Sequence, residues 1–270
     1  MSQTFAHQIT DIVSERPQAV RLPDWFSALP GQDIALSQSI LRMDQLVRDH
    51  GIHLYPQHDF HLFKVCMEAN QNTKAGLAPM YDPIHCKLGP ENSLWLAGLD
   101  EHGDIVTTQS GKLFNFTGTN LREAGNNLTL FYDNPPSADA GVRCRIESPF
   151  AMNITGICAH SGGIWVHPRY RGVGPNGLRL SQILGRITRN IILATWSPDY
   201  IFSFAQTILA RKGVVASYGW PNVQTGVTMT FPYCGAVDDV LAWSSRAELL
   251  DDARQIAMGG PLTRPLVAAE

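Results

Sequence analysis

The stretch from Gly162 to Gly177 constrains the fold more than any other part of the chain. It begins with the β-forming residues Ile164 to Val166, which a proline follows, and continues into a loop with glycines at 172, 174 and 177. Beyond the loop, apolar residues recur at helical spacing: Leu180, Leu184, Ile187, Ile191 and Ala194. We therefore expect a strand, a glycine-rich loop and a helix, an order typical of anion sites because free N–H groups converge at the helix start.

The charge around this loop is strongly biased. No acidic residue lies between Glu147 and Asp199, although the whole chain has a net charge of −3. The same interval holds five arginines: Arg169, Arg171, Arg179, Arg186 and Arg189. Arginines around backbone N–H groups favour a ligand that carries a polyphosphate. For Arg186 and Arg189, a solvated helix face is the simpler interpretation.

Other interpretations of the loop remain open. Gly172-x-Gly174-x-x-Gly177 has the glycine spacing of a dinucleotide site, but it lies late in the chain, and Asp199 follows a loop signal rather than a second strand. A P-loop would need Gly-Lys-Ser or Gly-Lys-Thr, which is absent. A nucleotide-dependent enzyme and a glycine-rich turn without a ligand both stay as alternatives.

Val166-His167-Pro168-x-x-Arg171-Gly172-x-Gly174, followed by an amphipathic helix, resembles the acyl-CoA signature of the GNAT superfamily of N-acetyltransferases. In that family Arg/Gln-x-x-Gly-x-Gly/Ala holds the CoA pyrophosphate on backbone amides. The resemblance puts Arg171, Gly174 and Asn176 in the three signature positions. Asn176 departs from the pattern, and Pro175 has no N–H to donate. The implied cofactor-binding residues are Ile164, Trp165, Val166, Arg171, Gly172, Val173, Gly174, Asn176 and Gly177.

The resemblance implies an α/β (α+β) fold with a mixed, mostly antiparallel central sheet flanked by helices. An acyl-CoA slot would lie between two splayed strands. The sequence agrees in order: a hairpin over 93–116 precedes a strand over 154–166, and a further strand covers 200–204. Paired glycines at 162 and 163 indicate a bulge in the strand, or else a hairpin turn that divides it.

Local patterns predict the remaining elements. Helices are expected over 34–49, 60–70, 205–212 and 247–258, and strands over 52–55, 128–132, 215–220 and 227–231. We divide the chain into an N-terminal arm and helix (1–50), a GNAT-like acyltransferase domain (51–260) with an insertion near 120–150, and a tail (261–270).

Acyl transfer to an amine needs a proton acceptor and a donor for the departing thiolate. His160 is the candidate base, since an unperturbed histidine has a pKa near 6.5. Tyr218 is the candidate acid, and a purely structural role is equally open for both. Many family members carry a tyrosine as the acid where this chain has Leu209, which cannot donate a proton.

These residues predict an N-acyltransferase that uses acetyl-CoA or another acyl-CoA. Its acceptor would be an amine, either a small molecule or a peptide. Because Leu209 replaces the usual tyrosine, the alternative is a catalytically idle acyl-CoA-binding or regulatory module on the same fold.

The composition of the chain argues against several classes of binding partner. A net charge of −3 argues against nucleic-acid binding, and no apolar run approaches a membrane span. Five scattered cysteines, without C-x-x-C spacing, and the lack of a signal-peptide pattern favour free thiols in the cytoplasm. The histidines at 50, 53, 58 and 61 lack a zinc pattern, so no metal is expected. A homodimer is compatible with the sequence.

Overall fold

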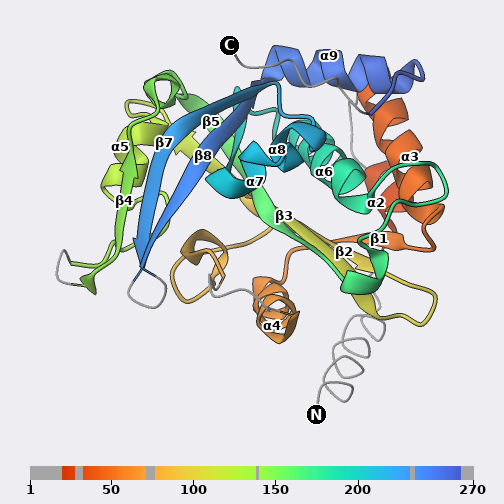
Figure 1. Cartoon of the computed structure of the whole chain (residues 1–270), viewed down its shortest axis with the longest axis horizontal. Helices are drawn as coiled ribbons and strands as arrows, with labels where there is room; N and C mark the ends of the chain where they lie inside the picture. The colour runs from red at the N-terminus through yellow and green to blue at the C-terminus, as the bar shows by residue number, and fades with distance from the viewer. Residues whose placement is uncertain (1–19, 28–32, 71–76, 138–139, 232–234, 263–270) are drawn as a thin grey trace.

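The fold is built on one mixed β-sheet (Figure 1). The computed structural model describes residues 20–27, 33–70, 77–137, 140–231 and 235–262. In these ranges the strands run in the order β1-β2-β3-β5-β6-β8-β7-β4. Their bounds are β1 His53–Gln57, β2 Ser93–Leu99, β3 Ile105–Phe116, β4 Arg143–Ile146, β5 Gly156–Val166, β6 Tyr200–Gln206, β7 Asn222–Phe231 and β8 Gly235–Ser245.

Helices lie on both sides of this sheet. The α-helices are α2 Leu22–Ser27, α3 Ile34–Arg48, α4 Phe60–Asn70, α5 Leu121–Asn126, α6 Leu180–Trp196, α7 Thr207–Arg211, α8 Val214–Ser217 and α9 Arg246–Ala257. Within the described ranges, 3-10 turns occur at η1 Pro79–Tyr81, η3 Pro149–Met152 and η4 Pro168–Tyr170. The mixed α/β fold class predicted from the sequence is confirmed.

Strand pairing is antiparallel between neighbours throughout the described sheet, with one exception. β5 and β6 run parallel, and α6 between them provides the crossover connection that parallel neighbours need. The predicted hairpin is present as β2 and β3, and the turn between them is closed by a bond from Gly103 N–H to Asp100 O. The sheet is therefore mixed and mostly antiparallel, as expected.

One face of the sheet is covered by α3, α6 and α9, which pack on one another (Figure 1). The apolar stripe of α6 lies in this core, with Leu180, Leu184, Ile187 and Ile191 buried. α6 approaches β3 closely at Gly111, where an added Cβ would lie 2.5 Å from Ile192 Cδ1. Only glycine permits this separation between helix and sheet.

The other face has a second core, rich in aromatic residues. α4 and η1 lie on this face and contribute Phe63 and Tyr81, which contact each other edge to face. Trp95 from β2 and Phe202 from β6 complete the centre of the cluster. The pocket described below opens on this face.

Two strand predictions are wrong. Residues 128–132 form turns after α5, closed by bonds such as Tyr132 N–H to Leu128 O. Residues 215–220 form the end of α8 and a turn, because Gly213 at φ 74° starts a helical turn instead of a strand. The sheet is instead completed by β4 and β8, which local patterns did not predict.

The interpretation of Arg186 and Arg189 as a solvated face is also wrong, because both side chains are buried. Arg186 forms an ion pair with Asp252 of α9 at 2.9 Å. Arg189 donates to Tyr218 O at 2.8 Å and lies 4.1 Å from the centre of the Trp220 ring. Both cations hold α6 against its neighbours.

The remaining predictions can be compared with the structure only over the described residues. None of the described helices is long and apolar enough to cross a membrane. Cys66, Cys86, Cys144 and Cys158 are buried free thiols, whereas Cys234 lies outside the described residues. Most of the expected tail, 263–270, also lies outside them. The domain boundaries stay a prediction.

Candidate functional site

β5 and β6 pair at one end only. Their parallel register covers Cys158 with Tyr200, Ala159 with Ile201 and His160 with Phe202. Beyond this point β5 continues to Val166 beside β3, and β6 continues to Gln206 beside β8. The two strands therefore splay apart after His160 and Phe202, as the resemblance predicted.

A bulge in β5 accompanies the splay. Thr108 of β3 pairs with Trp165, and Ser110 pairs with Gly162, so two residues of β5 lie opposite Gln109 alone. Gly163, at φ 64°, occupies the bulge. Because a bulge bends its strand and increases the local twist, it directs β5 away from β6. The bulge prediction is confirmed, and the alternative of a hairpin turn is wrong.

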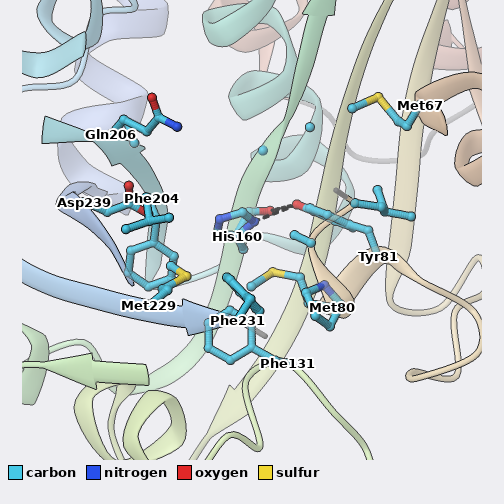
Figure 2. A pocket seen from close by; sticks show the side chains of 17 residues that line it. Met67, Met80, Tyr81, Phe131, His160, Phe204, Gln206, Met229, Phe231 and Asp239 are labelled. Carbon is cyan, nitrogen blue, oxygen red and sulfur yellow. Dashed lines mark hydrogen bonds between the residues drawn. The ribbon is translucent and has the colours of Figure 1, made fainter. Parts of the chain in front are cut away.

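His160 lies at the vertex of the splay and is buried. Its Nδ1 is 2.7 Å from the hydroxyl of Tyr81, which η1 brings from the other side of the pocket (Figure 2). The same hydroxyl is 3.3 Å from the backbone oxygen of His160. With Ser110 O at 3.4 Å as well, the hydroxyl of Tyr81 has three acceptors within reach, and its contact with Nδ1 holds the imidazole in place.

Burial changes the acid–base properties of His160. Desolvation, with a smaller contribution from the nearby Lys112 cation, lowers the pKa of His160 to about 3. The imidazole is thus neutral at physiological pH, and it is a weaker base than an ordinary histidine. Its role as the base stays a prediction.

His160 borders a pocket of about 290 Å³ on the aromatic face of the sheet (Figure 2). Alternate residues of neighbouring strands form much of its wall, as the two-residue period of a strand dictates. These are His160 and Gly162 of β5, Phe204 and Gln206 of β6, Met229 and Phe231 of β7, and Val237 and Asp239 of β8. We call this pocket the chamber.

The chamber contains one buried carboxylate, Asp239. The residue is 9% exposed, and its Oδ1 has no hydrogen-bond partner among the described residues. Burial, and to a lesser extent the charge of Asp238, raises the pKa of Asp239 to about 6. Neither Lys nor Arg occurs among the described residues that line the chamber.

The glycine-rich loop that follows β5 is largely occupied by its own contacts. Gly174 N–H donates to Leu178 O at 2.8 Å, and Gly177 N–H donates to Gly174 O at 3.0 Å. Asn176 Nδ2 donates to Leu46 O at the end of α3. A side chain at Gly174 would overlap the ring of His50. Two of the expected phosphate-binding amides thus close the loop, and binding of CoA there stays a prediction.

The arginines of the loop differ in their contacts. Arg171 is exposed and donates through Nε to Val166 O at 2.8 Å, while Arg179 is exposed at the start of α6. Arg169 pairs with Asp100 at 2.6 Å. The signature spacing is also met two residues earlier, by Arg169, Gly172 and Gly174, which puts a glycine in the last place. In that alignment Asn176 no longer falls on a signature position.

The other expected site residues lie apart from His160. Tyr218 does not line the chamber: its Cβ lies beside Gly185 of α6, and its side chain bonds to Ser181 in the first turn of that helix. Ile164 packs into the core of the α6 face, and Val166 is buried at the end of β5. The role of Tyr218 as an acid stays a prediction.

Sequence reasoning missed two residues of the chamber, Tyr81 and Asp239. Tyr81 lies in a loop rich in proline and glycine that carries no pattern. Asp239 had a usable signal, because two acidic residues, Asp238 and Asp239, interrupt the apolar run Val237 to Trp243. No group of His, Cys, Asp and Glu that could hold a metal occurs among the described residues.

Comparisons with known proteins give only remote likenesses. No protein-family model matches the chain, and no curated protein matches it. Among solved structures it is similar to mutant forms of the spermidine/spermine N-acetyltransferase SpeG from Vibrio cholerae, with 8% identity, a TM-score of 0.39, and coverage of 75% of this chain and 98% of that one.

A second similar structure is a chimera of spermidine N-acetyltransferase SpeG from Vibrio cholerae and hSSAT. Its identity is 9% and its TM-score 0.36, over 73% of this chain and 98% of the other. At these TM-scores the likeness carries no argument about activity, which has to come from the residues of this chain.

Proposed function

We propose that the chain is an acyl-CoA-dependent N-acyltransferase, with acetyl-CoA as the first donor to test and an amine as acceptor. The observation that supports this most is the splay of β5 and β6 beside the chamber. Past His160 and Phe202, each strand has an edge that no longer pairs with the other. Backbone N–H and C=O groups on such edges need partners, and the amides of a pantetheine arm can provide them.

The diphosphate of the donor is assigned to the start of α6. The first turn of a helix has N–H groups without partners in the helix, and its dipole favours an anion. Arg171 and Arg179 are exposed there and carry no acidic neighbour in the sequence. The loop amides of Gly174 and Gly177 are occupied, so these two arginines and the helix start are expected to provide most of the binding.

The reaction joins the amine nitrogen to the acyl carbon and breaks the carbon–sulfur bond, and the amine loses a proton. His160 is proposed to accept that proton. Two tautomers are compatible with its contact to Tyr81. When Tyr81 donates to His160 O, Nδ1–H donates to Tyr81 and leaves Nε2 as an acceptor. In that tautomer His160 can act as a base through Nε2, whereas Nε2 carries the hydrogen when Tyr81 donates to Nδ1.

Titration calorimetry with acetyl-CoA tests donor binding. We expect the wild-type protein to bind it and Arg171→Ala/Arg179→Ala to bind it at least tenfold more weakly, because a charge-assisted phosphate contact contributes about 1.5–3 kcal/mol. Arg254→Ala, an exposed arginine of α9, is the control and should bind normally. Binding of ATP or NAD without binding of CoA would favour the nucleotide alternative and overturn the proposal.

A thiol-release assay with a panel of amines then separates an enzyme from an idle binding module. Leu209, which is 38% exposed and has no proton to donate, is the observation that favours the idle module. We expect release of CoA in the presence of amines, and a slower rate with unchanged acetyl-CoA affinity in His160→Ala. Tight acetyl-CoA binding without release of thiol from any amine would favour the idle module.

A further inference from the structure

Asp239 is the one buried charge-bearing side chain of the chamber that nothing in the described structure neutralises. The residue is more than nine-tenths buried, and its Oδ1 lacks a hydrogen-bond partner. Burial of a carboxylate without a partner is costly, so a protein retains such a group where a ligand completes it. The missing partner is therefore a cation or a hydrogen-bond donor.

The surroundings of Asp239 select among these partners. Its neighbours in the wall are the apolar residues Phe204, Met229, Phe231 and Val237 and the uncharged amide of its strand partner Gln206, and none of them carries a charge. Apolar walls bind the body of a ligand by burial of its surface, and they strengthen an ion pair because water is excluded. A ligand with an apolar body and one positive end fits both features.

The position of Asp239 along the sheet shows where this ligand would lie relative to the splay of β5 and β6. Asp239 pairs with Gln206, and His160 pairs with Phe202. Their partners on β6, Phe202 and Gln206, are four residues apart. At about 3.3 Å per residue, this separates Asp239 from His160 by roughly 13 Å along the strand direction. Figure 2 shows Asp239 and Gln206 on one side of His160 and Tyr81 on the other. Asp239 lies where β5 and β6 no longer pair, the place assigned to the donor.

We propose that the chamber binds a primary amine with an apolar body, whose ammonium pairs with Asp239 and whose body lies toward His160. The proposal rests on the proposed function only in naming this amine as the acceptor, which for transfer has to leave Asp239 and present its neutral nitrogen to His160; the binding itself does not need the donor. Strongly polar amines, such as amino sugars, and amines that carry an anion are excluded by the apolar wall and by Asp239.

Titration calorimetry at pH 7.5 without CoA tests the proposal, with 2-phenylethylamine as the probe. We expect the probe to bind the wild-type protein and to bind Asp239→Asn at least tenfold more weakly. Asp238→Asn is the matched control: Asp238 is the adjacent residue of β8, but it is exposed and receives a bond from Thr228. The control variant should bind the probe as the wild type does.

Two further ligands sharpen the result. 2-Phenylethanol keeps the body without the charge, and ethanolamine keeps the charge without the body; both should bind at least tenfold more weakly than 2-phenylethylamine. Equal affinity of 2-phenylethanol and 2-phenylethylamine, or an unchanged affinity in Asp239→Asn, would overturn the proposal. So would the absence of binding by both 2-phenylethylamine and hexylamine.

The outcome is separable from that of the proposed function. If 2-phenylethylamine binds through Asp239 while acetyl-CoA does not bind, the donor assignment fails and the amine site stands. If acetyl-CoA binds and thiol is released only with polar amines, the proposed function stands and the amine class fails.

Discussion

The glycine-rich loop follows the end of β5, and the chamber is lined by the middle of the same strand. The two regions differ in how many of their polar groups have hydrogen-bond partners within the protein. In the loop, Gly174 and Gly177 donate to carbonyls of the loop itself, and Asn176 bonds to α3. In the chamber, Asp239 is buried without a hydrogen-bond partner for Oδ1. A glycine motif marks a local conformation, whereas an incomplete polar group in a cavity marks a site for something from outside.

The largest expected effect concerns acid stability, through His160 in the chamber. Its pKa falls from 6.5 to about 3 on folding, so the unfolded chain binds the proton more tightly. Stability is therefore lost as pH falls below 6.5, by roughly 4 kcal/mol near pH 3.5. Urea unfolding from pH 7.5 to 3.5 should show a shallower acid loss for His160→Gln. Parallel curves for the two proteins would contradict the burial of a neutral imidazole.

A glycine of the bulge and a glycine of the loop should respond differently to alanine. At Gly163, φ is 64° and a new Cβ would lie 2.7 Å from Ser110 Oγ and 2.8 Å from Phe63 Cζ. At Gly172 a new Cβ meets nothing within 4 Å. We expect Gly163→Ala to lose about 3 kcal/mol of stability and Gly172→Ala less than about 0.5 kcal/mol.

Thermal unfolding of the two glycine variants measures this difference. Equal stabilities would mean that the chamber wall is as adaptable as the loop, and the comparison between the two regions would fail.

In contrast to the glycine substitutions, replacement of Asp239 should increase the stability of the protein. Its pKa is raised from 3.8 to about 6 on folding, so the folded chain binds the proton more tightly. Stability is therefore lost as pH rises from 3.8 through about 6, where the buried carboxylate becomes charged, and Asp239→Asn removes that cost. We expect the variant to gain roughly 2–3 kcal/mol over the wild type at pH 8 and little at pH 4. Urea unfolding at both values checks this, and an equal gain at both would contradict it.

A smaller effect than at Gly163 or Asp239 is expected in the loop, at Asn176. Its side chain donates to Leu46 O and accepts from Leu178 N–H, and both bonds are partly buried. Asn176→Ala should lose about 1 kcal/mol of stability. Thermal unfolding measures it, and hydrogen exchange at Leu178 should become faster. A loss above that of Gly163→Ala would mean that the loop, rather than the bulge, is the more constrained region.

Local sequence patterns predicted the central elements of the fold. The strand, loop and helix from Ile164 to Trp196, the hairpin of β2 and β3, and the bulge at Gly163 all occur as expected. Each depends on residues close together in the chain: β-branched runs, helical periodicity and glycines at positive φ. The two wrong strands, at 128–132 and 215–220, were short apolar runs, in which local propensity is weakest and tertiary contacts decide.

The sequence by itself determined the elements on either side of the splay, and it pointed to His160. Only the tertiary structure showed that Arg186 pairs with Asp252, that Tyr81 holds His160, and that Asp239 lies unneutralised in the same chamber. These partners are far apart in the chain, 79 residues for Tyr81 and His160. Such contacts depend on which strands become neighbours and which faces are buried, and no local pattern of residues contains that information.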